Sequence, residues 1–247
     1  MSKLFKRAPL SDKEKAMREA LPRAARPKKA ATIILWHGPR DNPRILMGQR
    51  AKKHDFMPSV YVFPGGRVDR GDSYASYEGS LSPRTDRILS AAYAPRQARA
   101  IVLTAIRETY EETGLMIGRE APQLRNPKHE SWQAFYDAGV SADLSGIEVI
   151  GRAVTPPRRH KRFDTWFFEK RVSEDIIGAA SDSMELEDVR WMTFAEIAEC
   201  PLHTATNSML DVMKDHLARD KAAPEILYMR NERRGYVVGS FPPTDKI

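Results

Sequence analysis

The 247-residue sequence predicts an α/β (α+β) fold, with one large domain flanked by terminal extensions. Short apolar segments of strand length recur along the chain. Longer segments without internal Pro or Gly have the apolar spacing of amphipathic helices. The apolar fraction of 41% is ordinary for a globular protein and is sufficient for a sizeable core.

A first pair of strands is expected before residue 50. Residues 30–36 are apolar with a β-branched centre, which suits a strand buried on both faces of a sheet. A turn between Pro39 and Pro43 leads into residues 44–49, which we expect to form the hairpin partner strand. Further strands are expected at residues 60–63, 115–117, 147–153, 163–169 and 189–192.

Helices are expected between and after these strands. The strongest prediction covers residues 97–113, because Pro95 suits a first helical turn and no Pro or Gly interrupts the segment. Gly114 can then adopt the left-handed conformation that ends a helix. Other helices are expected at residues 12–21, 130–138 and 207–217, and one more begins at Thr193.

Three carboxylates share one face of the helix over residues 97–113, because Glu108, Glu111 and Glu112 stand at positions i, i+3 and i+4. They repel one another, and no Lys or Arg lies between Glu108 and Glu112 to relieve the repulsion. Hard oxygen ligands of this kind suit a divalent cation such as Mg²⁺ or Mn²⁺. A solvated acidic face is the alternative interpretation.

The glycines upstream of this helix favour the cation. The apolar strand at residues 60–63 ends sharply at Pro64-Gly65-Gly66. A glycine turn can bring backbone amides and carbonyls close to a ligand. The acidic helix face and the glycine turn together therefore predict a site for an anionic substrate and its cation.

These two segments resemble the signature box of the Nudix (MutT-like) hydrolase superfamily. Gly66 is followed after five residues by the acidic Asp72, and residues 107–115 match the second half of the box. The family has seven residues between the halves, whereas 34 separate Asp72 from Arg107, an insertion of 27. In this interruption the chain resembles one branch of the superfamily, the peroxisomal coenzyme A diphosphatase-like proteins and their bacterial relatives. Residues 56–66 and 162–168 resemble that branch as well.

The resemblance implies a Nudix α/β/α sandwich with a central mixed sheet, and hydrolysis of a pyrophosphate bond into two monophosphates. It implies that Mg²⁺ or Mn²⁺ is held by Glu108, Glu111, Glu112 and the Gly65 carbonyl. The catalytic candidates are Glu108, Arg107, Glu111 and Glu185; Glu108 or Glu185 would take a proton, and Arg107 would orient a neighbouring glutamate. The substrate-binding candidates are Arg50, Gly66, Arg162 and Asp164.

Two residues depart from the pattern of the box. Asp72 stands where the family has Glu, and Thr109 stands where it usually has an aliphatic residue. The role of Asp72 is therefore open. So is that of the inserted segment at about residues 73–95, whose tyrosines could either stack on a ligand or pack against the body.

Coenzyme A or an acyl-CoA is the substrate that the resemblance implies. An ADP-ribose or NADH pyrophosphatase and a non-catalytic nucleotide-sensing module are the alternatives. A small-molecule partner is expected rather than nucleic acid, and the resemblance implies that the chain could form a homodimer. The single cysteine, Cys200, and the lack of an apolar run long enough for a membrane span favour a cytoplasmic protein.

The formal charge of +7 resides at one end of the chain. Residues 1–29 hold ten Lys or Arg and three Asp or Glu, and the rest of the chain is balanced. The sequence therefore divides into a basic arm at residues 1–29, a hydrolase domain at 30–220 and a tail at 221–247. The arm is interpreted as a solvated extension, because it lacks the interleaved aromatic residues of a stacking platform. An RNA-end pyrophosphatase that uses the arm is the alternative.

Overall fold

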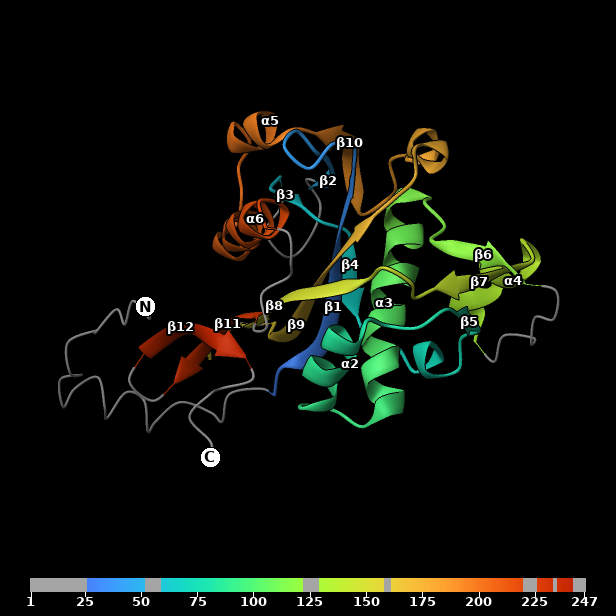
Figure 1. Cartoon of the computed structure of the whole chain (residues 1–247), viewed down its shortest axis with the longest axis horizontal. Coiled ribbons are helices and arrows are strands. Elements are labelled where there is room, and N and C mark those ends of the chain that lie inside the picture. Colours follow the sequence, from blue (N-terminus) through green and yellow to red (C-terminus); the bar gives the residue numbers. More distant parts are fainter. Residues whose placement is uncertain are drawn as a thin grey trace.

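The computed structural model describes residues 26–51, 59–121, 129–157, 161–219, 226–232 and 235–241 (Figure 1). Its centre is a mixed sheet in the order β10-β2-β1-β9-β8-β11-β12, with β3 paired to β2 and β4 paired to β1. The pairs β1–β9 and β8–β11 are parallel. The strands are β1 (Lys28–His37), β2 (Arg44–Arg50), β3 (Tyr61–Val62), β4 (Gly65–Arg67), β8 (Glu148–Val154), β9 (Phe163–Arg171), β10 (Leu186–Met192), β11 (Ile226–Glu232) and β12 (Gly235–Phe241).

Helices cover both faces of this sheet, as Figure 1 shows for α3 and α6. The helices on one face are α2 (Pro83–Ser90) and α3 (Pro95–Thr113), and those on the other are α5 (Phe194–Ala198) and α6 (Thr204–Leu217). The expected α/β/α sandwich is therefore confirmed. None of the described helices combines the length and the apolar character needed to cross a membrane.

The strand β1 separates two apolar cores. Its side chains alternate, so that Ile33 and Leu35 pack with α3 while Ile34 and Trp36 pack with α6. This explains why the segment is apolar at successive positions rather than at every second one. The central strand fixes α3 in place, and α3 carries the carboxylates.

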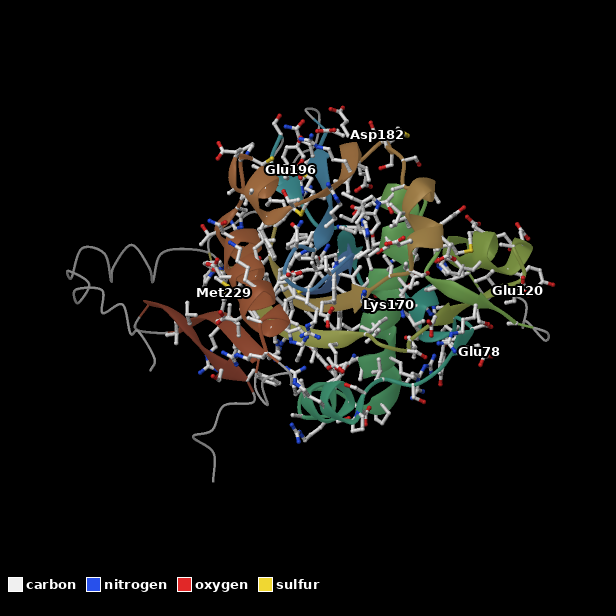
Figure 2. The ribbon with its side chains drawn as sticks, turned by 45° about the horizontal axis from the view of Figure 1, so that its top comes forward. Glu78, Glu120, Lys170, Asp182, Glu196 and Met229 are labelled. Carbon is white, nitrogen blue, oxygen red and sulfur yellow. The ribbon has the colours of Figure 1, made fainter. Side chains whose placement is uncertain are left out.

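A second, smaller sheet lies beside α3, at the opposite end of the molecule from the β11–β12 hairpin. Figure 2 shows this separation through Glu78 and Glu120 at one end and Met229 at the other. Its strand order is β5-β7-β6. The elements in this part are η1 (Gly71–Ser73), β5 (Tyr77–Glu78), β6 (Gly118–Glu120), η2 (Glu130–Trp132), α4 (Gln133–Asp137) and β7 (Val140–Asp143), while the 3-10 helix η3 (Glu174–Ala179) precedes β10. Lys170 of the main sheet joins the two sheets through an ion pair with Asp143 at 3.2 Å.

The inserted segment forms regular structure. It follows η1 and contributes β5 and α2. The side chain of Ser82 caps α2 by accepting a hydrogen bond from the Thr85 amide, and Ile88 and Leu89 are fully buried. The apolar pair Ile88-Leu89, within an otherwise polar segment, therefore marks the buried face of α2.

Other predictions differ from the structure in detail. Residues 64–66 were expected to be a turn, but Gly65–Arg67 forms β4 and pairs with β1. Residues 115–117 do not form the expected strand, and β6 begins at Gly118. The segment at residues 221–247, expected to be a tail, supplies β11 and β12 of the main sheet. Most of the basic arm lies outside the described residues, as do residues 56–58 of the resemblance.

Arg152 of β8 fastens the C-terminal hairpin to the sheet. Its guanidinium donates two hydrogen bonds to Asp164, at 2.8 and 2.7 Å. It also lies 4.8 to 5.2 Å from the ring centres of Trp166, Tyr228 and Phe241, and the last two belong to β11 and β12. Both members of the ion pair are mostly buried, with 14% and 16% of their side chains exposed.

Replacing Arg152 should therefore destabilise the protein strongly. We expect Arg152→Met to lower the free energy of unfolding by about 3 kcal/mol, because the substitution leaves the Asp164 carboxylate largely buried without its cation. Arg219→Met is the matched control: its pair with Asp215 spans 3.8 Å and is 55% and 75% exposed, so the loss should stay below about 1 kcal/mol. Urea denaturation followed by circular dichroism measures both, and equal losses would contradict the assignment.

Candidate active site

The glutamate face of α3 lies against the two glycines of β4. A Cβ atom at Gly66 would lie 2.4 Å from the carboxyl carbon of Glu108. A Cβ atom at Gly65 would lie 2.5 Å from the carbonyl oxygen of Ala31. The β1 backbone therefore requires glycine at position 65, whereas at position 66 glycine leaves the space that the end of the Glu108 side chain occupies.

The Glu112 carboxylate is fixed by this contact. It accepts a hydrogen bond from the Gly65 amide at 2.8 Å, and only 7% of the residue is exposed. The resemblance to Nudix hydrolases implies that the Gly65 carbonyl is a metal ligand. In the structure, the amide of the same residue donates its hydrogen bond to Glu112, so β4 and α3 meet at Gly65.

Arg107 lies between the other two glutamates. Its Nη1 atom is 2.9 Å from Glu108 and donates a hydrogen bond of 2.7 Å to Glu111. The expected contact between Arg107 and a neighbouring glutamate is thus present twice. The sequence analysis found no cation between Glu108 and Glu112 to relieve their repulsion; Arg107, one residue before Glu108, partly supplies it because i and i+4 share a helix face.

The opposite edge of the Arg107 guanidinium is held by Asp72. Its Nε and Nη2 atoms donate to the two oxygens of the Asp72 carboxylate at 2.8 and 3.1 Å. Asp72 is fully buried and also accepts from the Thr104 hydroxyl and the Trp132 indole. The acidic residue after Gly66 marked Asp72 in the sequence, whereas no sequence signal pointed to Thr104 or Trp132.

Arg50 and Glu185 are brought to the same place by the pairing of β2 with β10. Leu186 lies opposite Arg50, and the Ala51 amide donates to the Glu185 carbonyl at 3.0 Å. Burial lowers the pKa of Arg50, while the charges of Glu112 and Glu185 oppose that shift. Two of the residues selected outside the helix therefore lie within electrostatic reach of the glutamate face.

Burial makes the ionised state of these glutamates costly. It raises the pKa of Glu108 to about 7 against the opposing charge of Arg107. It raises the pKa of Glu112 to about 8 against the Gly65 amide, and the charges of Glu108 and Glu185 add to the rise. The pKa of Glu111 is raised in the same way.

This donor set fits a divalent cation. Five carboxylates meet two guanidinium groups here, so the fully ionised cluster carries three excess negative charges. The carboxylates are Asp72, Glu108, Glu111, Glu112 and Glu185, and the guanidinium groups are Arg50 and Arg107. Within the described ranges, no three acidic, His or Cys side chains converge in a preformed metal cluster. Instead, the oxygens bond to Arg107 and to the Gly65 amide.

The two remaining candidates lie farther along the sheet. Phe167 is in register with Thr32, which is opposite Gly65. Arg162 lies five residues before Phe167, and Asp164 lies three residues before Phe167. These separations correspond to about 16 and 10 Å along the strand. Asp164 is bonded to Arg152 and to the Tyr93 hydroxyl, and the Arg162 Nε donates to the Thr155 carbonyl. The structure does not bring these two residues to the glutamates.

The fold and the site together define an α/β/α protein with a carboxylate-rich helix face suited to a divalent cation. No family model matches the chain. Over 70% of its length the chain is 27% identical to nudix hydrolase 7 of Caenorhabditis elegans, and it covers 52% of that protein. Over 39% of its length it is 30% identical to the acyl-coenzyme A diphosphatase NUDT19 of Gallus gallus, covering 34% of that protein. The chain thus spans about half the length of the first relative and about a third of the second.

A solved structure extends the likeness over more of the chain. The crystal structure of a NUDIX hydrolase from Alicyclobacillus acidocaldarius is 25% identical, with a TM-score of 0.61. The match covers 78% of this chain and 93% of that one. The chain belongs to the Nudix hydrolase superfamily.

The raised pKa values predict how stability depends on pH without a divalent cation. The folded protein keeps protons on Glu108 and Glu112 up to about pH 7 and 8, whereas the unfolded chain releases them near 4.5. Stability from these groups should therefore be present at low pH and be lost as pH rises from about 4.5 to 8. Thermal unfolding in EDTA at several pH values measures this slope, and Mn²⁺ should raise Tm more at pH 9 than at pH 6.

The variant Glu108→Gln/Glu112→Gln supplies the control for this slope. It lacks both titrating groups, so its Tm should depend less on pH over the same range. An unchanged slope in the double variant would show that other groups cause the pH dependence.

Alanine substitutions at the two glycines should have different effects. Gly65→Ala pushes a methyl group against the β1 backbone, so we expect lower thermal stability. Gly66→Ala meets only the end of the Glu108 side chain, which can move, so the protein should stay folded and bind Mn²⁺ more weakly. Thermal unfolding and Mn²⁺ titration of both variants test this, and the reverse pattern would contradict the packing.

Proposed function

We propose that the protein hydrolyses a pyrophosphate bond in a nucleoside diphosphate linked to another moiety, with Mg²⁺ or Mn²⁺ as the cofactor. The observation that carries the proposal is the glutamate face of α3, buried against a diglycine strand and held by Arg107. Its excess negative charge and its raised pKa values are the properties of a site that becomes stable on binding a cation. The membership of the superfamily supports the same reaction class.

The chain's own residues can be assigned roles in this reaction. Glu108, Glu111, Glu112 and the Gly65 carbonyl would hold the cation. When bound, such a cation neutralises phosphate charge and acidifies water. The oxygen of water forms a bond to one phosphorus, the bridging P–O bond breaks, and a carboxylate takes the proton of water.

Glu108 and Glu185 are the two candidates for the proton acceptor. Without a cation, burial raises the pKa of Glu108 to about 7. A bound cation would lower this pKa and leave the carboxylate ionised, in the state that accepts a proton. Arg50 lies near Glu112 and Glu185, where its guanidinium could receive a phosphate oxygen.

Coenzyme A or an acyl-CoA is our proposal for the substrate. It is supported by the similarity to NUDT19, which is named an acyl-coenzyme A diphosphatase. The distance along β9 adds a physical argument. If the pyrophosphate lies at the glutamates and Arg162 also contacts the substrate, the substrate must extend along β9, whose backbone separates the two places by about 16 Å; coenzyme A is long enough to do so.

A hydrolysis screen tests both levels of the proposal. Coenzyme A, acyl-CoA, ADP-ribose, NADH and dinucleoside polyphosphates would be incubated with Mg²⁺ or Mn²⁺, and products separated by chromatography. We expect monophosphate products, with coenzyme A or its esters as the best substrates. Preference for ADP-ribose or NADH would replace the substrate proposal, and no hydrolysis of any compound would favour a nucleotide-sensing module.

The variant Glu112→Gln tests the reaction itself. It keeps the shape of a buried side chain that lies 2.8 Å from the Gly65 amide, so the protein should stay folded, but it loses one carboxylate of the proposed metal set. We expect turnover to fall by at least about 100-fold. Metal-dependent turnover near the parental rate would remove this helix face from the mechanism.

A further inference from the structure

Trp132 belongs to η2, in a segment outside the box, yet its indole reaches the acidic residue that holds Arg107. Its Nε1 atom donates a hydrogen bond to Asp72 at 3.0 Å, and 3% of the residue is exposed. Resting on the proposed function, we propose that Trp132 is a positioning residue that sets the place of Glu108 and Glu111 through Asp72 and Arg107.

The first step of this connection is the saturation of Asp72. One carboxylate oxygen accepts from Trp132 and from Arg107, and the other accepts from the Asp69 amide, the Thr104 hydroxyl and Arg107. A carboxylate has about four lone-pair sites, so these five donors saturate it, and the Thr104 hydroxyl shares its one proton between Asp72 and the Ala100 carbonyl. Asp72 cannot rotate without leaving buried donors unpaired, so removal of one donor loosens the whole arrangement.

The second step is the rigidity of the guanidinium group. Its five N–H groups have a fixed planar geometry. When Nε and Nη2 of Arg107 are bonded to Asp72, the direction of Nη1 is determined as well. Nη1 is the atom that lies 2.9 Å from Glu108 and 2.7 Å from Glu111. A shift of Asp72 is therefore passed to both glutamates.

The third step is the origin of Trp132. Asp69 belongs to the first half of the box, and Thr104 lies on α3 one turn before the second half, so their contacts arise from the box and its own helix. Trp132 instead comes from the segment at residues 129–137, between β6 and β7 of the small sheet, and it packs on Phe135 with ring centres 4.9 Å apart. The His129 side chain of the same segment lies against Gly71. This segment therefore packs against η1 and gives Asp72 a donor that does not come from α3.

The contact also explains how an aspartate serves at position 72. Its side chain is one methylene shorter than the glutamate usual in the box. The structure surrounds it with donors from three places, namely the loop before η1, the helix α3 and η2. The indole shares its acceptor oxygen of Asp72 with the Nε atom of Arg107.

The variant Trp132→Phe tests the proposal, because it keeps most of the packing and removes only the indole donor. Trp191→Phe is the matched control: its Nε1 donates to the Ile177 carbonyl at 3.1 Å, away from Asp72. For each protein we would measure kcat and KM on the best substrate of the screen, Mn²⁺ affinity by calorimetry and thermal stability. We expect Trp132→Phe to lower kcat and Mn²⁺ affinity by about 3- to 10-fold, with KM within about twofold.

A second pair of variants reaches the same carboxylate from within α3. Thr104→Val removes another donor to Asp72, whereas Thr109→Val removes a buried hydroxyl that bonds only within the helix, to the Ala105 carbonyl. The first should reproduce the loss of kcat and Mn²⁺ affinity, and the second should not. This pair decides the matter if Trp132→Phe does not fold.

Parental kcat and Mn²⁺ affinity in Trp132→Phe, or losses equal to those of Trp191→Phe, would overturn the proposal. Failure of the proposed function would look different, because the parental protein itself would then hydrolyse no pyrophosphate substrate. In that event the Mn²⁺ titration still decides: weaker binding by Trp132→Phe than by the parental protein supports the positioning role, and equal binding contradicts it.

Discussion

The buried pairing of Arg107 with Asp72 determines how the candidate site is arranged. The Arg107 side chain is 5% exposed and that of Asp72 is not exposed at all, so neither charge can be screened by water. A pair of this kind contributes little net stability, but it fixes geometry, because a planar guanidinium has few ways to meet a carboxylate. Arg107 uses its remaining N–H groups on Glu111 and on the Arg67 carbonyl, which ties the helix to β4.

The same burial sets up a conflict that a cation would resolve. α3 holds three glutamates on one face, and one Arg107 cannot neutralise them all. The close approach of β4 at Gly65 and Gly66 limits the access of water to Glu108 and Glu112, whereas the Glu111 side chain stays 40% exposed. The sheet thus holds several carboxylates close together, and the proposed cation would neutralise them.

Much of this arrangement could be predicted from sequence because it is local. The helix face follows from spacing at i, i+3 and i+4, and the end of α3 follows from Gly114, which has a φ of 73°. The double burial of β1 follows from its unbroken apolar run. These features depend on residues close together in the chain, where periodicity and turn chemistry decide the structure.

What could not be predicted depends on contacts between distant segments. Trp132 and Asp72 are 60 residues apart, and β11 pairs with β8 across more than 70 residues. The repulsion on α3 was overestimated because the direction of the Arg107 side chain is set by Asp72, which no spacing rule reveals. Asp164 was placed with the substrate because its motif is shared with relatives, whereas its carboxylate is bonded to Arg152.

The central claim is that the glutamate face of α3 exists to hold a divalent cation against β4. Anomalous X-ray diffraction from crystals grown with Mn²⁺ tests it most directly, because the ion identifies itself independently of any substrate. The account predicts an anomalous peak within about 2.5 Å of carboxylate oxygens of Glu108 and Glu112. At saturating Mn²⁺, no peak at this face, with Glu108 and Glu111 still paired to Arg107, would contradict it.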